Sequence, residues 1–319
     1  MKRTHKNIQV TEIGTLARSI IKTLAYYDIF NYPLTKEEIY SCSITNGDTK
    51  ASVFDKLELL VASGIIYNND KFYSINHNSQ LIPKRIEGNK RAINKMKTAK
   101  LFSKFISHFP FVRCVLLSGS ISKGYMDEKA DIDYFIITGP DRLWIARIML
   151  VFFKKLFLLN SYKFFCINYF ISTSELKIEE KNIYTAIELA TLIPMYGADV
   201  YNKFYAANQW IKTYVPNYPK RDVANLPPFK KKVIQTVIES LLNRRFGDYI
   251  DDKVMKLFVR FDEKRYGKLD EGTFRLAFKT RKNISKHHPN FFQKRVLESL
   301  RLKLEQLESK HNIVFGELD

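Results

Sequence analysis

The chain has 319 residues, of which 45% are hydrophobic and 14% aromatic, with only 12 Gly and 10 Pro. This composition can bury a sizeable core and excludes collagen-like, low-complexity and wholly disordered chains. The length predicts about two domains and a small module. Lys and Arg number 52 against 33 Asp and Glu, a formal charge of +19, which favours anionic partners.

Three further observations bear on location. The three cysteines lie far apart and give neither a disulfide framework nor a zinc-site spacing, so we expect a reducing, cytoplasmic environment. The N-terminus has charges but no apolar run after them, which is untypical of a secretory signal. The most apolar stretch, residues 143–159, is interrupted by Arg147, Lys154 and Lys155 and is too short for a membrane span. We expect a buried helix there and no membrane partner.

Residues 1–80 are predicted to form a small N-terminal module. Apolar residues at three- and four-residue intervals predict a helix over 12–30. Thr35 and Glu38 form a capping box at the start of a second helix, and a third helix over 49–63 ends at Gly64. Two β-prone runs around 68–70 predict a hairpin. This order resembles a winged helix-turn-helix.

The third helix would be the DNA-reading helix of such a module. Its two lysines, Lys50 and Lys56, are balanced by Asp55 and Glu58, whereas DNA readers neutralise several phosphates. We therefore favour a structural or partner-binding role for the module, with DNA binding as the open alternative.

Residues 84–200 are predicted to form a central domain with a small mixed β-sheet and flanking helices. The order is a basic helix, a strand, a polar loop, a strand, a helix, a strand and a helix. The ranges are 84–109, 111–118, 119–130, 132–138, 142–159, 162–171 and 182–196.

Residues 201–319 are predicted to form a basic α-helical C-terminal domain, so that the whole chain is of the α+β class. Its basic clusters could bind a polynucleotide or could form solvated helix faces. They are Lys230-Lys231-Lys232, Arg244-Arg245, Lys264-Arg265 and Arg281-Lys282.

The segment from 116 to 137 carries the most informative motif. Gly119 and Ser120 follow the first strand, and Asp131 and Asp133 begin the second. Residues i and i+2 of a strand share a face, so we expect the two carboxylates to lie side by side and to bind Mg²⁺ or Mn²⁺ together with substrate phosphates. Gly124 permits a close backbone approach, and Lys123 could reach a phosphate or could simply be solvated.

This segment resembles the signature of the polymerase-beta-type nucleotidyltransferase superfamily: an apolar strand, Gly-Ser, ten residues, then Asp-x-Asp in a second apolar strand. The resemblance covers about residues 90–200 as a fold and is sharp only over 116–137. It implies that Gly119 and Ser120 bind a nucleoside triphosphate and that Asp131 and Asp133 bind two metal ions. It also implies the transfer of a nucleoside monophosphate to a hydroxyl acceptor.

A third carboxylate, which the superfamily commonly places on a later strand, is not found over 162–171. Alternation puts Cys166 and Asn168 on one face of that strand and Tyr169 on the other, so Asn168 stands where the carboxylate is expected. An amide can coordinate a metal but cannot act as a base. Glu188 on the next helix is the alternative. Two functions therefore remain: a metal-dependent nucleotidyltransferase with an unidentified acceptor, or an inactive protein of this fold that binds nucleic acid or a partner.

Overall fold

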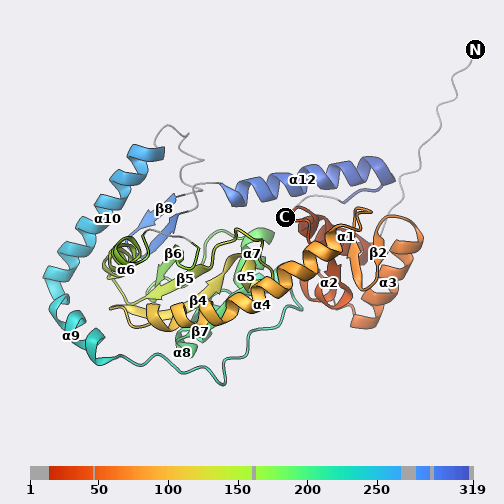
Figure 1. Cartoon of the computed structure of the whole chain (residues 1–319). Helices are drawn as coiled ribbons and strands as arrows, with labels where there is room; N and C mark the ends of the chain where they lie inside the picture. The colour runs from red at the N-terminus through yellow and green to blue at the C-terminus, as the bar shows by residue number, and fades with distance from the viewer. Residues whose placement is uncertain (1–13, 46, 160–162, 267–277, 288–290, 316–319) are drawn as a thin grey trace, which may run out of the picture.

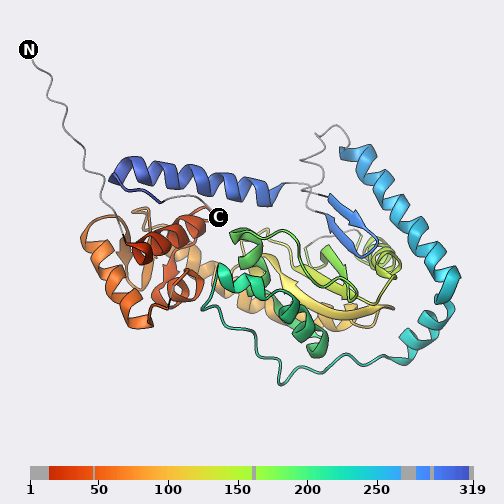
Figure 2. The same ribbon diagram turned by 180° about the vertical axis from the view of Figure 1, so that it is seen from behind.

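The computed structural model describes residues 14–45, 47–159, 163–266, 278–287 and 291–315 of the chain, and it contains both helices and sheets. A small three-stranded sheet lies with the N-terminal helices at one end of the molecule, and a six-stranded sheet lies at the other. The last helix, α12 (Phe292–His311), runs from the larger sheet along the N-terminal end (Figures 1 and 2).

The N-terminal module contains the helices and the hairpin that the sequence predicts. Thr35 accepts a hydrogen bond from the backbone of Glu38, and the Glu38 carboxylate accepts one from the backbone of Thr35, which confirms the capping box. The strand β1 completes an antiparallel sheet of order β1-β3-β2. The elements are α1 (Thr15–Asp28), β1 (Leu34–Thr35), α2 (Lys36–Cys42), α3 (Lys50–Ala62), β2 (Tyr67–Asn69) and β3 (Phe72–Ser74). Residues 12–13 of the predicted first helix lie outside the described residues.

The central part of the chain forms most of the larger sheet. Its strand order is β7-β4-β5-β6-β9-β8, with β5 and β6 parallel and the other neighbours antiparallel, so the predicted mixed sheet is confirmed. The elements are α4 (Leu81–Ile106), β4 (Val112–Ser118), α5 (Gly119–Ser122), β5 (Asp133–Thr138), α6 (Leu143–Phe157), β6 (Cys166–Ser172), α7 (Ile183–Thr191), β7 (Ile193–Tyr196), α8 (Ala198–Ala207) and a 3₁₀ helix (Gln209–Thr213). Residue 162, the first of the third predicted strand, lies outside the described residues, and β6 begins later than predicted, at Cys166.

The predicted helix over 182–196 is too long. It ends at Thr191, and the chain continues as β7, which pairs with β4 at the edge of the sheet. Pro194 lacks the N–H that a helix interior needs, but it is tolerated in an edge strand, here opposite Leu116.

The prediction of a wholly helical C-terminal part is wrong. The hairpin of β8 (Phe278–Arg281) and β9 (Ile284–His287) extends the larger sheet through β6. The strand β9 reads Ile-Ser-Lys-His, so its polar residues hide the apolar alternation by which a strand is recognised. The helices are α9 (Val233–Leu241), α10 (Arg244–Tyr266) and α12.

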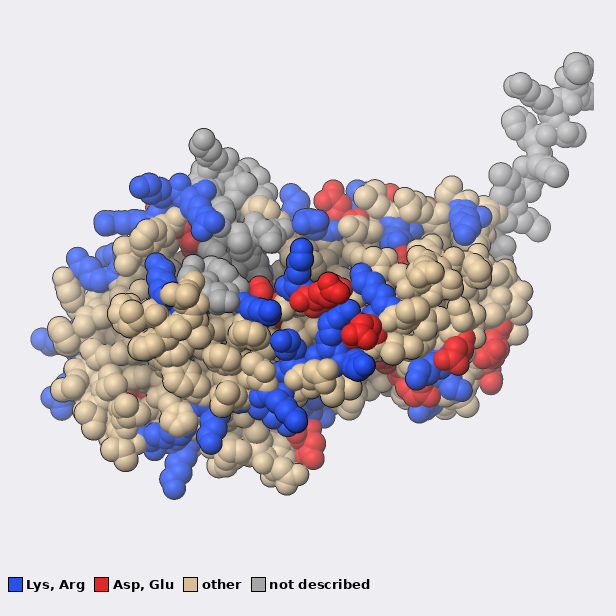
Figure 3. All heavy atoms as spheres, viewed as in Figure 1, with Lys and Arg blue, Asp and Glu red and all other residues tan. Residues whose placement is uncertain are grey.

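Several basic side chains of this C-terminal part are bound to acidic groups. Figure 3 shows Lys and Arg side chains over much of one face and gathered at its middle, with Asp and Glu among them. Those that form ion pairs include Lys231, Lys279, Arg281, Lys282 and Lys303. Lys279 and Arg281 pair with Glu179, and Lys303 pairs with Asp28, so these three join the C-terminal part to the rest of the protein. Lys231 and Lys282 instead pair with acidic residues within the C-terminal part.

Helices cover both faces of the larger sheet. Side chains of α4 and α6 form one core with β4, β5 and β6. Side chains of α7 and α8 cover the other face, and this second core continues into the N-terminal module and α12. The stretch predicted as a buried helix, α6, is buried on one side only, because Phe152, Leu156 and Phe157 are exposed. Over the described ranges, no helix has the length and apolar character that crossing a membrane requires.

Arg85 on α4 fixes the N-terminal module to the central part. Its guanidinium donates to the Glu38 carboxylate at 2.6 Å and to the backbone carbonyl of Pro33 at 3.3 Å. It also stacks 3.5 Å from the ring centre of Tyr32. Because the Arg85 side chain is buried, these partners replace the water that the charge would otherwise bind.

Replacing Arg85 with Ala should lower the free energy of unfolding by about 3–5 kcal/mol, because the change leaves buried groups unpaired. Its neighbour Lys84 provides the control, since its contact with Asp127 at 3.7 Å is exposed. Lys84→Ala should change the free energy by less than about 1 kcal/mol. Urea denaturation of both variants measures the difference, and equal losses would contradict the role assigned to Arg85.

Candidate functional site

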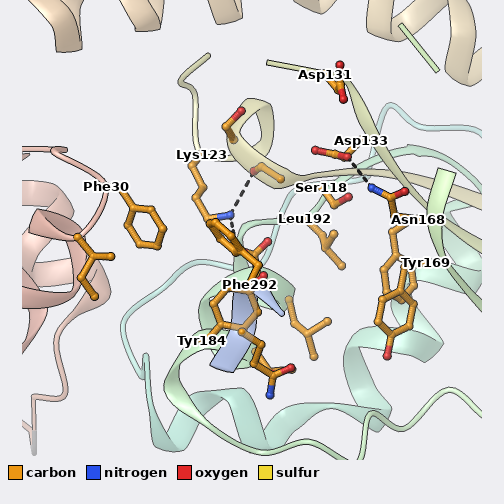
Figure 4. Close-up of a pocket in the computed structure, with 18 of the residues that line it drawn as sticks. Phe30, Ser118, Lys123, Asp131, Asp133, Asn168, Tyr169, Tyr184, Leu192 and Phe292 are labelled. Atoms are coloured by element: carbon orange, nitrogen blue, oxygen red, sulfur yellow. Dashed lines mark hydrogen bonds and ion pairs between the residues drawn. The ribbon is translucent and has the colours of Figure 1, made fainter. Parts of the chain in front are cut away.

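A cleft of about 950 Å³ lies where the N-terminal module, the larger sheet, α7 and the start of α12 meet (Figure 4). The structure brings most of the sequence-predicted site residues into its lining: Gly119, Ser120, Lys123, Asp131, Asp133, Asn168 and Glu188. Gly124 does not line this cleft. It faces α4, where the Asn89 side chain donates to its carbonyl.

The carboxylate of Asp133 packs directly against Gly119. The two residues are brought together by the β4–β5 register, in which Ser118 is opposite Asp133. A Cβ atom on residue 119 would lie 2.3 Å from Oδ2 of Asp133, and the φ of Gly119 is +65°. Both the close approach and the left-handed backbone therefore require glycine at this position.

Asp131 and Asp133 interact with each other, as expected for two carboxylates at one strand end. Asp131 precedes β5 and Asp133 is its first residue; both are half-buried. The pKa of Asp133 is raised to about 6, mainly by burial and also by the charges of Asp131 and Glu188, whereas a hydrogen bond with Cys166 and the charge of Lys123 oppose the rise. A cation between the carboxylates would relieve this repulsion.

Asn168 lies beside this pair, on the side of β6 that carries Cys166, and the strand is irregular at this point. Tyr134 pairs with Ile167 and Phe135 pairs with Tyr169, so Asn168 is an extra residue in β6. Its Nδ2 donates to Oδ1 of Asp133 at 3.0 Å. Cys166 and Asn168 both line the cleft, as the predicted alternation requires, but Tyr169 lines it too, so the prediction that Tyr169 lies on the other face is wrong. β-Bulges commonly redirect side chains in this way near functional sites.

Lys123 and Glu188 form an ion pair on another wall of the cleft. The Lys123 ammonium donates to Oε1 of Glu188 at 2.8 Å and to the carbonyl of Gly119 at 3.1 Å. The hydroxyl of Tyr32, from the N-terminal module, donates to the carbonyl of Lys123 at 3.1 Å. The Lys123 ammonium is thus held in place, and its third N–H can be offered to an anionic ligand.

Sequence reasoning missed a buried lysine next to the carboxylates. Burial raises the pKa of Asp131, and the charge of Lys154 on α6 opposes this rise. Lys154 is itself buried, and burial lowers its pKa. The sequence does contain a signal for this neighbour, namely a lysine within an apolar helical stretch. A lysine in such a stretch is rarely buried without an anionic group beside it.

Two carboxylates at one strand end are the chemical type of donor that hard divalent cations prefer. Within the described ranges there is no group of three or more His, Cys, Asp or Glu side chains that could hold a metal ion. Asp131 and Asp133 supply two carboxylates at one strand end. Mg²⁺ is commonly bound by one or two carboxylates, with water and phosphate oxygens completing its shell, so these two are the residues that could hold such a cation.

Comparisons with known proteins add no identification: no protein-family model, curated protein or solved structure matches the chain.

Replacing Gly119 with Ala should displace the Asp133 carboxylate. Gly64 is the control, because its φ is +71° and a Cβ there would meet nothing within 4 Å. Gly64→Ala should cost about 1 kcal/mol of backbone strain. Gly119→Ala should cost about 1–3 kcal/mol more, since it adds a collision.

Urea denaturation measures both losses, and calorimetry with Mn²⁺ measures whether Gly119→Ala alone weakens cation binding. Equal losses of stability would show that the Asp133 carboxylate is not packed against Gly119.

Proposed function

We propose that the protein is a metal-dependent nucleotidyltransferase that moves a nucleoside monophosphate from a nucleoside triphosphate to a hydroxyl acceptor. The observation that carries the proposal is the close packing of the Asp133 carboxylate against Gly119, with Asp131, Ser120 and Lys123 lining the same cleft. This cleft brings two carboxylates and a lysine ammonium to one strand end. The resemblance over residues 116–137 supports the same assignment.

Different side chains of the cleft would bind the metal ion and the phosphates. Asp131 and Asp133 would hold Mg²⁺ or Mn²⁺, which supplies neutralisation of phosphate charge when it is bound. Lys123 offers a cationic donor to the phosphates, and Gly119 and Ser120 leave room for them beside the strand end. The N-terminal module, which resembles a winged helix, would then serve as a wall of the cleft and would not read DNA.

The reaction forms a bond between the acceptor oxygen and the α-phosphorus and breaks the bond from that phosphorus to the pyrophosphate, which leaves. The acceptor hydroxyl must lose a proton. Asn168 cannot accept it, and its amide is bound to Asp133. Glu188 lines the cleft with its carboxylate held by Lys123, and we assign it the role of base.

The protein should transfer label from an α-labelled nucleoside triphosphate to a component of a cell extract in the presence of Mg²⁺ or Mn²⁺. Asp133→Ala should abolish this transfer while circular dichroism shows an intact fold. Asp127→Ala is the matched control, because Asp127 lines the same cleft with a side chain 59% exposed to solvent. It should transfer as the wild type does.

The same assay tests the base, since Glu188→Gln should lower the transfer rate about 100-fold or more. Unchanged transfer by Asp133→Ala would refute the assignment of the site. Absence of both transfer and nucleotide binding in the wild type would instead favour a non-catalytic protein that binds a partner or nucleic acid.

A further inference from the structure

A continuous belt of aromatic rings lines the cleft. Each ring centre lies between 5.3 and 6.1 Å from the next. In spatial order the rings belong to Tyr125, Tyr32, Tyr27, Tyr26, Phe30, Phe292 and Tyr184, and all seven line the cleft.

The belt is assembled from parts of the chain that are distant in sequence. Four of the rings come from α1 and the loop that follows it, whereas Phe292 begins α12 and Tyr184 lies on α7. Figure 4 shows Phe30, Phe292 and Tyr184 on the side of the cleft away from Asp131. Asp131 and the rings of Phe30, Phe292 and Tyr184 therefore lie on different sides of one cavity, which suits a ligand with an anionic part and an apolar part.

The end of the belt near α12 presents ring surface to the cavity. Phe30 and Tyr184 are half-buried, and Phe292 is 43% exposed although it is a large apolar side chain. Aromatic faces in a cavity bind planar rings well, because stacking adds to the burial of apolar area.

Tyr26 lines the cleft and carries a buried hydroxyl among these rings. The residue is 2% exposed, and its hydroxyl is buried with no hydrogen-bond partner among the residues that the structure describes. Burial and the charge of Glu188 raise the pKa of Tyr26, so the hydroxyl stays protonated and can donate. A buried hydroxyl without a partner is unfavourable, and a ligand with an acceptor atom would satisfy it.

We propose that this aromatic belt is a subsite for a planar ring with a polar edge. The ring packs on Phe30, Phe292 and Tyr184, and its polar atom accepts a hydrogen bond from Tyr26. The inference rests on the proposed function for the source of the ring, which is either the base of the nucleoside triphosphate or an aromatic group of the acceptor. Binding of the ring itself requires neither metal nor transfer.

The test is binding of small probes to the full chain, measured by saturation-transfer NMR and calorimetry. The probes are the four ribonucleosides, which carry no phosphate, p-cresol as a phenol, and ribose as a control without an aromatic ring. At least one ring probe should bind and ribose should not. Tyr26→Phe, which removes only the hydroxyl, should weaken ring binding about 3- to 10-fold.

Phe292→Ala should weaken the binding of the ring probes about 10-fold. Tyr73→Phe is the matched control, because Tyr73 is a buried tyrosine of the same module that is bonded to Glu58 and does not line the cleft. It should bind as the wild type does.

Each outcome has one meaning. Nucleoside binding that competes with a nucleoside triphosphate assigns the belt to the donor, and p-cresol binding that does not compete assigns it to the acceptor. Failure of every ring probe to bind would overturn the proposal. If Tyr26→Phe binds the ring probes as tightly as the wild type, the role of the hydroxyl is overturned. If Phe292→Ala does so, the role of the Phe292 ring face is overturned. Ring binding that persists in Asp131→Ala/Asp133→Ala, with no transfer by the wild type, would refute the proposed function alone.

Discussion

The contact between the Asp133 carboxylate and the backbone of Gly119 is the constraint on which the site depends. It exists because β4 and β5 pair with Ser118 opposite Asp133, and because residue 119 has no Cβ to occupy the space that Oδ2 needs. The turn after β4 can therefore carry Ser120 and Lys123 to the place where the carboxylates lie. A larger residue at position 119 would separate these two halves of the site.

The cleft around this contact is shared by segments from the whole length of the chain. Arg85 fixes the N-terminal module to α4, and Lys303 on α12 pairs with Asp28 at the end of α1 at 2.5 Å. The first and last helices are thus joined beside the larger sheet, and each adds rings to the cavity wall. This arrangement makes the N-terminal module part of the wall of the cleft. Under the proposed function the module would therefore contact the ligand, whereas the balanced charge of α3 does not favour DNA binding.

Local patterns predicted what depends on neighbours in sequence. The capping box at Thr35 and the two strands flanking Gly119 follow from short-range rules, and so does the pair of carboxylates. The β8–β9 hairpin and the aromatic belt depend on pairing between distant segments, so no local signal marks Phe292 as a neighbour of Phe30. The extra residue Asn168 in β6 broke the alternation that was used to assign faces, because one inserted residue moves every later side chain to the other face.

The most direct test of the central claim is a crystal structure of the protein with Mn²⁺ and a non-hydrolysable nucleoside triphosphate analogue, measured for the anomalous scattering of manganese. We predict an anomalous peak within coordination distance of the carboxylates of Asp131 and Asp133, with the triphosphate beside Gly119 and Ser120. Nucleotide bound in the cleft without a manganese peak at these carboxylates, or a peak at another site only, would contradict the account.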